Sequence, residues 1–493
     1  MRSLVAALVL AVAFAALARA ASEPLPLRYG VADDWPKWHD CGDAWWQAAK
    51  DIGFEDVRLT VQWDETQPDV VPNEENLAAA VDCAVASGVR PILAVYPLHA
   101  AAIGPDPAAQ ARFAAFVAEV GAAYPQVDDF IVGNEPNVNR FWQPQYAAGA
   151  DAAGTDYEHT LAASYDALKA VRSDAVVWGP AISSRGNDNP YAASNAGHSP
   201  VRFIQALGAA YRASARTRPI FDEFDMHPYP PVQDTAPFSR PFQWPQAGAA
   251  DLDRVKQALW DAFGGTAQPV PAEYAGGRSS SAGLPIDLDE AGEQTTLDGH
   301  DAAYVRPVES IKPIGQAAQA ARYVELARMA ACDPDVRSVL LFPLVDDPGV
   351  ADGFQSGELF ADLSHKRSYA ALKAQIAAAQ GLCPGAMHRW VHTKTVVGAA
   401  VSFAGRRVTV TAGEDATFRV WLLPAVGRRP ASARTATAIG AARAYRTPRV
   451  VVPAPARPGR YRIAVVLTAD TNPLRTAAFA SRTFRIGPPT RSK

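Results

Sequence analysis

Residues 91–133 read PILAVYPLHAAAIGPDPAAQARFAAFVAEVGAAYPQVDDFIVG. Two short apolar runs, Pro91–Tyr96 and Asp129–Gly133, enclose an Ala-rich stretch from Pro107 to Tyr124. The runs have the length of buried strands, and the stretch between them has the length of a helix. Parallel strands are joined by a crossover, which is usually helical, and strands buried on both faces read as continuous apolar runs. This segment therefore predicts a β–α–β unit.

The same alternation extends in both directions, from about residue 25 to 380. Predicted strands are Leu27–Val31, Val57–Trp63, Pro91–Tyr96, Asp129–Gly133, Ala175–Gly179, Phe221–Met226, Leu284–Leu288 and Val336–Leu344. Predicted helices are Asp43–Ile52, Asn73–Ser87, Pro107–Tyr124, Leu161–Ser173, Val201–Ala213, Ile314–Ala331 and Tyr369–Gln380. Eight such units indicate an α/β fold, a (β/α)₈ TIM barrel. A doubly wound open sheet is the alternative, but no Gly-rich phosphate loop follows the first strand.

The pattern changes near residue 385. Short, alternating, β-branched runs follow, separated by Pro- and Gly-rich turns: Thr393–Phe403, Arg407–Thr411, Thr417–Leu423, Val450–Val452, Tyr461–Leu467 and Ser481–Ile486. This pattern is typical of a small antiparallel β-sandwich. We therefore expect a barrel domain over residues 21–384 and a β-sandwich module over residues 385–493.

The amino terminus has the features of an export signal. Arg2 supplies a positive charge, Leu4 to Leu17 form an apolar run too short to span a bilayer, and Ala18-Arg19-Ala20 offers a small-x-small cleavage site. We expect residues 1–20 to be a signal peptide of a secreted protein without a membrane span. The alternative is a retained amino-terminal anchor.

Four cysteines are compatible with two disulfides in an oxidising compartment. In the barrel layout Cys41 precedes the first helix and Cys83 lies on the second, while Cys332 ends the seventh helix and Cys383 follows the eighth. Neighbouring helices favour the pairings Cys41–Cys83 and Cys332–Cys383. Neither pair has a C-x-x-C spacing, so no metal site is expected.

Charge is distributed unevenly along the chain. Residues 387–493 contain 19 Lys and Arg but three acidic residues, a balance of +16. Because the whole chain has a net charge of −4, the remainder carries −20. One interpretation is mutual docking of the two parts; the other is binding of the module to an anionic cell-envelope polymer through summed positive potential. No aromatic-interleaved basic motif favours nucleic acid.

Catalytic groups of barrels lie at the carboxyl ends of strands. The fourth predicted strand is followed by Asn134-Glu135-Pro136-Asn137, and the seventh by Asp289-Glu290-Ala291-Gly292. Two carboxyl groups about 5–5.5 Å apart are what cleavage of a glycosidic bond with retention requires. Glu135 and Glu290 can converge across a barrel mouth although they are far apart in sequence.

These motifs resemble those of glycoside hydrolase clan A, in its family 39-like and family 5-like branches. The likeness rests on Asn134-Glu135-Pro136-Asn137 with Arg140-Phe141-Trp142, on Asp225-Met226-His227-Pro228-Tyr229, and on a Glu ending the seventh strand. Gln355-Ser356-Gly357 and Lys366-Arg367-Ser368-Tyr369 are similar to that group's barrel closure. The resemblance covers residues 27 to 380. It implies a retaining hydrolase of β-linked oligo- or polysaccharides that needs no cofactor.

The resemblance also implies roles. Glu135 would be the general acid/base and Glu290 the nucleophile, with Arg58 at the end of the second strand keeping Glu290 ionised. Asn134 would bind the sugar 2-OH, His227 would order the acid/base side, and Tyr229 would orient the nucleophile. Arg58 could instead form an ordinary salt bridge, and His227 and Tyr229 could be packed core residues.

Two assignments stay open. Glu273 and Glu293 are alternatives to Glu290 as the nucleophile, although Asp-Glu-x-Gly after Leu284–Leu288 favours Glu290. A Trp that often follows the eighth strand in the clan is absent, so Phe342 is the candidate to replace it. Aromatic residues that flank the predicted strand ends and could stack on sugar are Trp35, Trp38, Trp63, Trp142 and Tyr96.

A second hypothesis is a barrel that binds carbohydrate or the cell envelope without turnover. Both carboxylates are present, which argues against this, whereas the missing Trp supports it. A barrel hydrolase of other chemistry is a third hypothesis, but no metal-ligand cluster and no Gly-x-Ser-x-Gly elbow occurs in the sequence.

Overall fold

A computed structural model describes residues 26–231, 236–273, 283–305, 312–350, 353–425 and 436–487. The chain forms two compact units, one of Met1–Phe242 with Gln246–Val391 and one of Gln243–Pro245 with His392–Lys493. The predicted signal peptide lies outside the described residues. Within the described part of the chain, no helix is long and apolar enough to cross a membrane.

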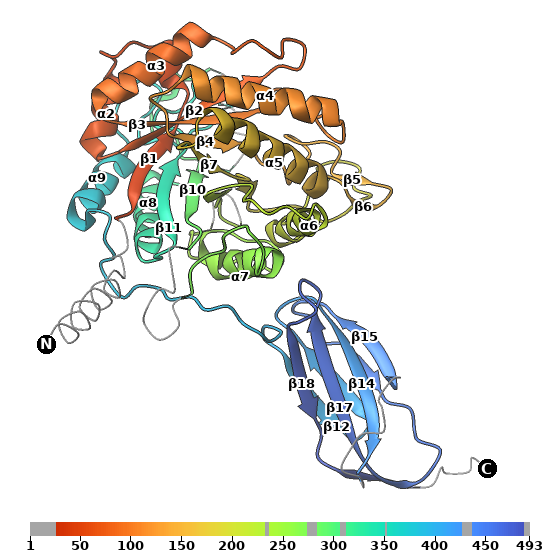
Figure 1. The fold of residues 1–493 in the computed structure, drawn as a ribbon. Coiled ribbons are helices and arrows are strands. Elements are labelled where there is room, and N and C mark those ends of the chain that lie inside the picture. The colour runs from red at the N-terminus through yellow and green to blue at the C-terminus, as the bar shows by residue number, and fades with distance from the viewer. Residues whose placement is uncertain are drawn as a thin grey trace, which may run out of the picture. The chain divides into compact units, whose positions relative to one another are not determined.

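The first unit is built around one parallel sheet (Figure 1). Its strands are β1 (Arg28–Ala32), β2 (Asp56–Trp63), β3 (Arg90–Pro97), β4 (Asp129–Val132), β7 (Val176–Trp178), β8 (Ile182–Ser183), β9 (Phe224–His227), β10 (Ile286–Ala291) and β11 (Val336–Leu341). The order is β7-β4-β3-β2-β1-β11-β10-β9-β8, and β7 and β8 are consecutive segments of one interrupted strand. The sheet therefore closes into an eight-stranded barrel.

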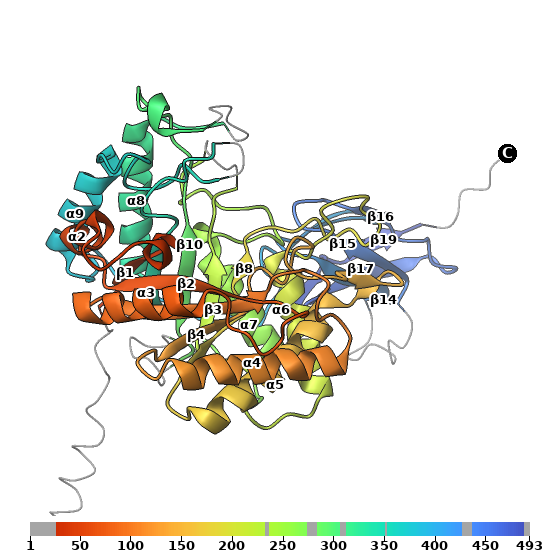
Figure 2. The same ribbon diagram turned by 90° about the horizontal axis from the view of Figure 1, so that it is seen from above.

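Helices surround the strands, as Figure 2 shows from above. They are α2 (Ala44–Ile52), α3 (Glu74–Ser87), α4 (Pro107–Ala123), α5 (Ala153–Val171), α6 (Pro200–Ala213), α7 (Leu252–Phe263), α8 (Gln316–Ala331) and α9 (Arg367–Ala379). Short 3₁₀ turns occupy Trp35–Trp38, Ala249–Asp251 and Asp301–Ala303, and a small hairpin joins β5 (Tyr146–Ala147) to β6 (Ala150–Asp151). The (β/α)₈ prediction is confirmed, and ring closure excludes an open doubly wound sheet.

Two helices depart from the prediction. α5 begins at Ala153 and not at Leu161, because the Asp151 carboxylate accepts hydrogen bonds from the Gly154 amide and the Thr155 hydroxyl at its first turn. α7 was not expected between the sixth and seventh strands. It is amphipathic, with the buried Val255, Leu259 and Phe263 spaced four residues apart on one face.

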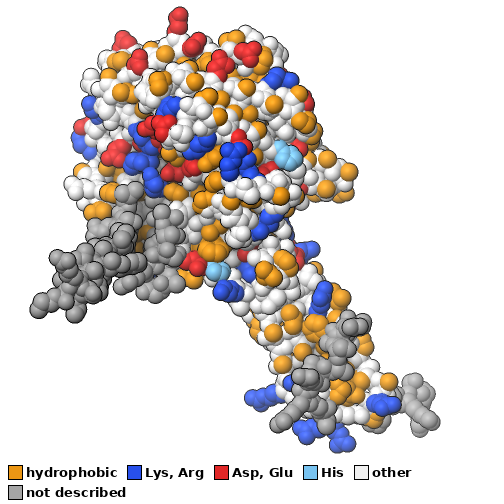
Figure 3. All heavy atoms as spheres, in the orientation of Figure 1, with side chains coloured by type: hydrophobic (Ala, Val, Ile, Leu, Met, Phe, Trp, Pro, Cys, Tyr) orange, Lys and Arg blue, Asp and Glu red, His pale blue; other side chains and the backbone are white. Residues whose placement is uncertain are grey.

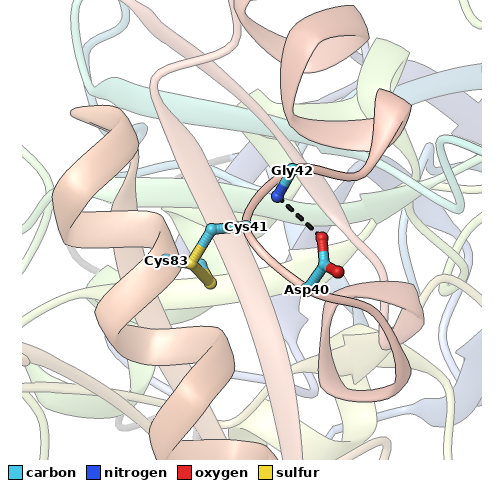
Figure 4. The surroundings of a disulfide bond; sticks show 4 residues. All are labelled: Asp40, Cys41, Gly42 and Cys83. Carbon is cyan, nitrogen blue, oxygen red and sulfur yellow. Dashed lines mark hydrogen bonds between the residues drawn. A yellow bond between two sulfur atoms is a disulfide. The ribbon is translucent and has the colours of Figure 1, made fainter.

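Both expected disulfides are present. Cys41 bonds to Cys83 on α3, with a Cα–Cα distance of 5.0 Å, and Figure 4 shows this bond beside the turn in which the Gly42 amide donates to the Asp40 carboxylate. Cys332, at the end of α8, bonds to Cys383 after α9, with a Cα–Cα distance of 4.5 Å. Each bond joins segments from neighbouring β/α units, as the barrel layout implied.

The second unit contains two antiparallel sheets. One has the order β12 (Ala400–Ala404), β13 (Arg407–Thr411), β16 (Arg449–Val451). The other has the order β15 (Ala438–Ala442), β14 (Ala416–Pro424), β17 (Gly459–Ala469), β18 (Thr476–Ala480), with β19 (Phe484–Ile486) also on β17. Alternate residues of both sheets, among them Val408, Phe418 and Val465, form one buried cluster. The predicted carboxyl-terminal antiparallel β region is confirmed.

Candidate active site

Glu135 enters the barrel mouth from the turn after β4. Gly133 has φ +103°, and a Cβ there would lie 2.8 Å from the Tyr157 ring, so the turn requires glycine. Glu135 itself has φ +40°, an uncommon conformation for a residue with a side chain, and its amide donates to the Ala181 carbonyl at 2.9 Å. Such backbone geometry is concentrated at functional positions.

Glu290 is the fifth of the six residues of β10, and two side chains hold its carboxylate. The Tyr229 hydroxyl donates to Oε1 at 2.7 Å, and the Arg58 guanidinium donates to Oε2 at 3.1 Å. Arg58 also donates to the Asn134 side-chain oxygen at 2.8 Å. Arg58, Asn134, Tyr229 and Glu290 therefore form one connected group.

His227 joins the two candidate carboxylates. Its Nδ1 lies 3.0 Å from Glu135 Oε1 and 3.5 Å from Glu290 Oε2. These two oxygens can therefore be no more than about 6.5 Å apart. The His227 side chain is fully buried, whereas the side chains of Glu135 and Glu290 keep 15% and 14% of their surface exposed. The carboxylates are thus close together and accessible to a ligand.

Beneath this group lies Asp289, which is fully buried. Its Oδ2 is 3.5 Å from both His227 Nε2 and Arg58 Nε. Burial alone would lower the pKa of His227, but the Glu290 and Asp289 carboxylates raise it well above its ordinary value. Burial likewise raises the pKa of Asp289, but His227 and Arg58 bring it below the ordinary range. His227 is consequently favoured as imidazolium, whose two nitrogens both donate.

Asp225 is the other buried acid of this cluster. Burial, and then the Asp289 charge, raise its pKa well above normal, and its Oδ1 accepts the Ala181 amide at 2.6 Å. The Ala181 residue therefore connects Asp225 to the backbone of Glu135 through its carbonyl. Neither Asp225 nor Asp289 was predicted as a site residue, although both lie within the quoted motifs.

The position of Arg58 corrects one expectation. Arg58 is the third residue of β2, not its last, and it pairs with Ala32 at the end of β1. Strands of a closed barrel are staggered, so the middle of one strand can be level with the end of its neighbour. The long side chain then reaches Glu290 at the mouth.

The aromatic candidates separate into two groups. Trp63 and Trp142 are 0% and 2% exposed, Trp63 packing on Phe113 and Trp142 on Tyr157, so neither can offer its face to a sugar. Phe342 lines a cavity of about 300 Å³ that also contains Arg58. The other lining residues are Ala32, Asp33, Asp34, Trp35, Trp38, Thr60, Pro343, Val345 and Asp347, and Trp38 is 56% exposed. A small cavity thus adjoins the nucleophile candidate.

The alternative nucleophiles lie elsewhere. Glu293 is buried, and Arg322 donates to both of its carboxylate oxygens at 2.8 and 2.9 Å. Glu273 directly follows Ala272, which lies against Gly283, and Val270 pairs with Leu284. These contacts are at the amino end of β10, opposite the mouth. Glu290 is the carboxylate of the three that is brought to Glu135.

One set of side chains in the described residues could hold a metal ion. Ligand atoms of Asp64, Glu65 and His99 lie within 4.8 Å of one another. Asp64 already accepts hydrogen bonds from Thr66, and Glu65 lies 3.1 Å from an exposed His99. The catalytic candidates are not part of this set.

No family model matches the chain, and no curated protein matches it in sequence. Among solved structures it is similar in fold to a family 39 glycoside hydrolase from the gut symbiont Bacteroides cellulosilyticus WH2 (TM-score 0.48, 16% identity, over 87% of this chain and 81% of that chain). It is also similar to a family 39 β-xylosidase from Caulobacter crescentus (TM-score 0.47, 16% identity, 82% and 84%). An exo-β-1,4-mannosidase from Opitutaceae bacterium strain TAV5 matches with TM-score 0.43, 15% identity, and coverage of 73% and 61%.

Proposed function

We propose that the protein is a retaining glycoside hydrolase in which Glu135 is the general acid/base and Glu290 the nucleophile. The observation that carries the proposal is the approach of both carboxylates to the same nitrogen, Nδ1 of His227, at 3.0 and 3.5 Å. Retaining enzymes separate their two carboxyl groups by about 5–5.5 Å, whereas inverting enzymes need about 6.5–9.5 Å to admit a water molecule. The upper limit of about 6.5 Å between Glu135 Oε1 and Glu290 Oε2 is compatible with the retaining geometry.

In the first step, Glu290 attacks the anomeric carbon while the bond to the leaving oxygen breaks and Glu135 protonates that oxygen. Arg58 and Tyr229 each donate to the Glu290 carboxylate, so they hold it in one orientation. Both hydrogen bonds weaken as negative charge leaves the Glu290 carboxylate during the attack. Neither donor has to change its position for this to happen.

In the second step, Glu135 removes a proton from water, which attacks the glycosyl–Glu290 ester and releases the sugar with retained configuration. Asn134 accepts from Arg58 through its side-chain oxygen, which turns its NH₂ group into the available donor. That group would bind the sugar 2-OH. The cavity beside Arg58 is the candidate sugar site, with Phe342 and Trp38 as its apolar walls.

The preference for β-linked oligo- or polysaccharides rests on the clan A motif resemblance. We further propose that the protein is secreted, because the amino-terminal segment has the features of a signal peptide and both disulfides suit an oxidising compartment. An anionic cell-envelope polymer is the proposed partner of the basic carboxyl-terminal module.

The direct test uses a panel of 2-deoxy-2-fluoro glycosides with good leaving groups. The fluorine slows breakdown of the glycosyl–enzyme ester, so the nucleophile stays labelled. Purified protein is incubated with each compound, and the labelled peptide is mapped by mass spectrometry. We expect one label, on Glu290, and the reactive sugar identifies the substrate class.

A label on Glu293 or Glu273 would contradict the assignment of the nucleophile but not the mechanism. Absence of label with every sugar, together with no release of chromophore from the unfluorinated panel, would favour a carbohydrate-binding protein without turnover. A matched protein with Glu290→Gln controls for non-specific esterification.

A further inference from the structure

The three acidic residues of the second unit lie at one end of it, where they contact two arginines. Glu414 receives hydrogen bonds from the buried Arg475 at 3.0 and 2.6 Å, and Arg443 lies 3.0 Å from both Asp415 and Asp470. These acids precede β14 or follow β17, which pair at Ala416 and Ala469. The module sequence contains no other acidic residue, and among the described residues no ion pair joins Arg460, Arg462 or Arg485 to an acid of the module.

The other end of the same sheet carries arginines instead. β17 is eleven residues long, which separates its two ends by about 33 Å. Arg460 and Arg462 lie at its beginning, and Arg485 lies on β19. All three side chains are exposed. Figure 3 shows Lys and Arg side chains at this end of the module, without a described Asp or Glu beside them on the face drawn.

Strand register puts these three arginines on one face. Ile463 and Val465 point into the core, so by alternation Arg460 and Arg462 point outward. Phe484 packs against the same core, so Arg485 also points outward. Arg460 pairs directly with Arg485 across β17 and β19. Directly opposed residues of an antiparallel pair have Cβ atoms about 5 Å apart, and like charges there are destabilising.

An unfavourable pair of like charges that no acid offsets is a feature of a surface that binds an anion. We propose that Arg460, Arg462 and Arg485 form a site for an anionic polysaccharide, whose acidic groups lie between the guanidinium groups. Three guanidinium groups spaced along two strands suit a chain with repeated carboxylates or sulfates better than one small ion, because each anionic group can be shared by two donors. The proposal locates the partner named above and does not depend on hydrolysis.

One aromatic residue belongs to this face. Trp421 on β14 pairs with Ala464, so it lies diagonal to Arg462 and, by the same alternation, points outward. It is half-buried. A single indole beside guanidinium groups can contact the apolar face of an acidic sugar, whereas binding of single-stranded nucleic acid uses several stacking aromatics. The chemistry therefore favours an acidic polysaccharide over nucleic acid.

The test measures binding of the full-length protein to two matched polymer pairs, polygalacturonate with its methyl ester, and dextran sulfate with dextran. We expect binding of the charged member of each pair only, with affinity that falls steeply as salt increases. The relative affinity for the two charged polymers distinguishes carboxylate from sulfate. Absence of binding to both charged polymers at low salt would overturn the proposal.

Two triple variants separate the site from net charge. Arg460→Glu/Arg462→Glu/Arg485→Glu should weaken binding by about 10-fold or more, whereas Arg407→Glu/Arg419→Glu/Arg449→Glu, with the same change in charge, should weaken it only about 2–3-fold. Equal losses would overturn the site. The proposed site would also be overturned if single-stranded DNA bound as tightly as polygalacturonate at equal charge. A changed radius of gyration with unchanged polymer affinity would instead assign the arginines to docking on the acidic barrel.

A single variant gives a second, independent readout. Arg485→Glu replaces like charges with opposite charges directly across β17 and β19, so the melting temperature should rise slightly while polymer affinity falls. Arg449→Glu on β16, which has no directly opposed arginine, is the matched control and should leave affinity nearly unchanged. Loss of both stability and affinity in Arg485→Glu would indicate a structural role and contradict the proposal.

Discussion

The barrel holds two clusters of charged side chains, at opposite ends of the same strands, and they differ in how completely their acids are paired. At the amino ends, Arg90 donates to both oxygens of Asp56 at 2.9 Å and also pairs with Asp129. The second oxygen of Asp129 accepts the Trp178 indole at 3.0 Å. These carboxylates are buried, and each of their oxygens has a donor.

At the carboxyl ends, the pairing is less complete. Glu135 is approached by His227 through Oε1 and stays partly exposed, and its backbone has an uncommon positive φ. The imidazole is held from below by Asp289, which is fully buried. Complete pairing of Asp56 and Asp129 fits a role in stability, whereas an accessible carboxylate supported by buried charges fits a role in chemistry. The comparison predicts that substitutions at the two ends have opposite consequences.

The largest effect is expected at the mouth. Glu290→Gln removes the proposed nucleophile while keeping a side chain of the same size. Turnover should fall by on the order of 10⁴-fold or more, as when other nucleophiles are removed. Thermal unfolding should change little, because the side chain is partly exposed. Initial rates on an activated glycoside and a melting curve measure both.

Glu293→Gln is the matched control for this prediction. It removes the acid that Arg322 contacts through both oxygens, so we expect lower stability with turnover within about 10-fold of the parent. If Glu293→Gln lost turnover as fully as Glu290→Gln while staying folded, the assignment of the nucleophile would be wrong.

The second effect is expected at the amino ends of the strands. Asp56→Asn leaves Arg90 and Arg28 without the carboxylate they share, at a site where Asp56 is fully buried. Breaking a buried ion pair by removing one partner costs about 3–5 kcal/mol. Urea unfolding should report this loss, whereas kcat per folded molecule should stay near that of the parent. A large fall in kcat with unchanged stability would reverse the comparison.

Much of the barrel could be predicted from sequence because its strands are buried on both faces. Continuous apolar runs such as Ile92–Val95 stand out against the Ala-rich helices. The turn Gly133–Glu135 was recognisable because its residues directly follow such a run. Strands β15 and β18 were missed because three of the five residues in each are Ala, which carries little strand signal compared with β-branched residues.

Site residues beyond the motifs were harder to predict because they depend on three-dimensional stagger and depth. The reach of Arg58 follows from the offset between β1 and β2, which a sequence does not display. Trp63 and Trp142 were candidates to stack on sugar because they flank predicted strand ends, but aromatic partners cover them. Asp289 and Glu290 are consecutive, yet both contact His227 and Arg58. The β10–β11 register is irregular between Leu288 and Ala291, and a sequence does not display such an irregularity.

A third effect tests the support beneath the carboxylates. Asp289→Asn removes one of the two charges that raise the pKa of His227, so the imidazolium should lose its proton at lower pH. We expect kcat to fall roughly 10-fold and the alkaline limb of the pH profile to move toward neutral pH. Asp225→Asn is the control, because the pKa of Asp225 is already raised by burial and Asn can still accept the Ala181 amide.

Stability provides a check of the same assignment. A histidine whose folded pKa is raised contributes stability that is fully present below its unfolded pKa of about 6.5 and is lost as pH rises through the folded value. Asp289→Asn should therefore destabilise the protein more at pH 6 than at high pH. An unchanged pH profile together with a pH-independent loss of stability would show that Asp289 does not act through His227.

The smallest effect is expected from Asp287, on β10 toward the amino end of the barrel. Burial, and then the neighbouring Glu223, raise its pKa well above normal, and its Oδ1 accepts the Ser338 hydroxyl at 2.6 Å. The folded state thus keeps a proton that the unfolded chain releases near pH 4, so this residue lowers stability as pH rises through that window. Asp287→Asn keeps the acceptor without the charge.

Asp287→Asn should therefore raise the free energy of unfolding by on the order of 1 kcal/mol relative to the parent at pH 7, and leave it unchanged near pH 3.5. Chemical unfolding at several pH values measures the difference. Asp56→Asn is the contrasting variant, since it removes an acid that two arginines pair with and should lower stability. If Asp287→Asn instead destabilised the protein at pH 7 and had no effect near pH 3.5, the amino-end cluster would depend on the Asp287 charge, and its acids would be balanced as a group and not residue by residue.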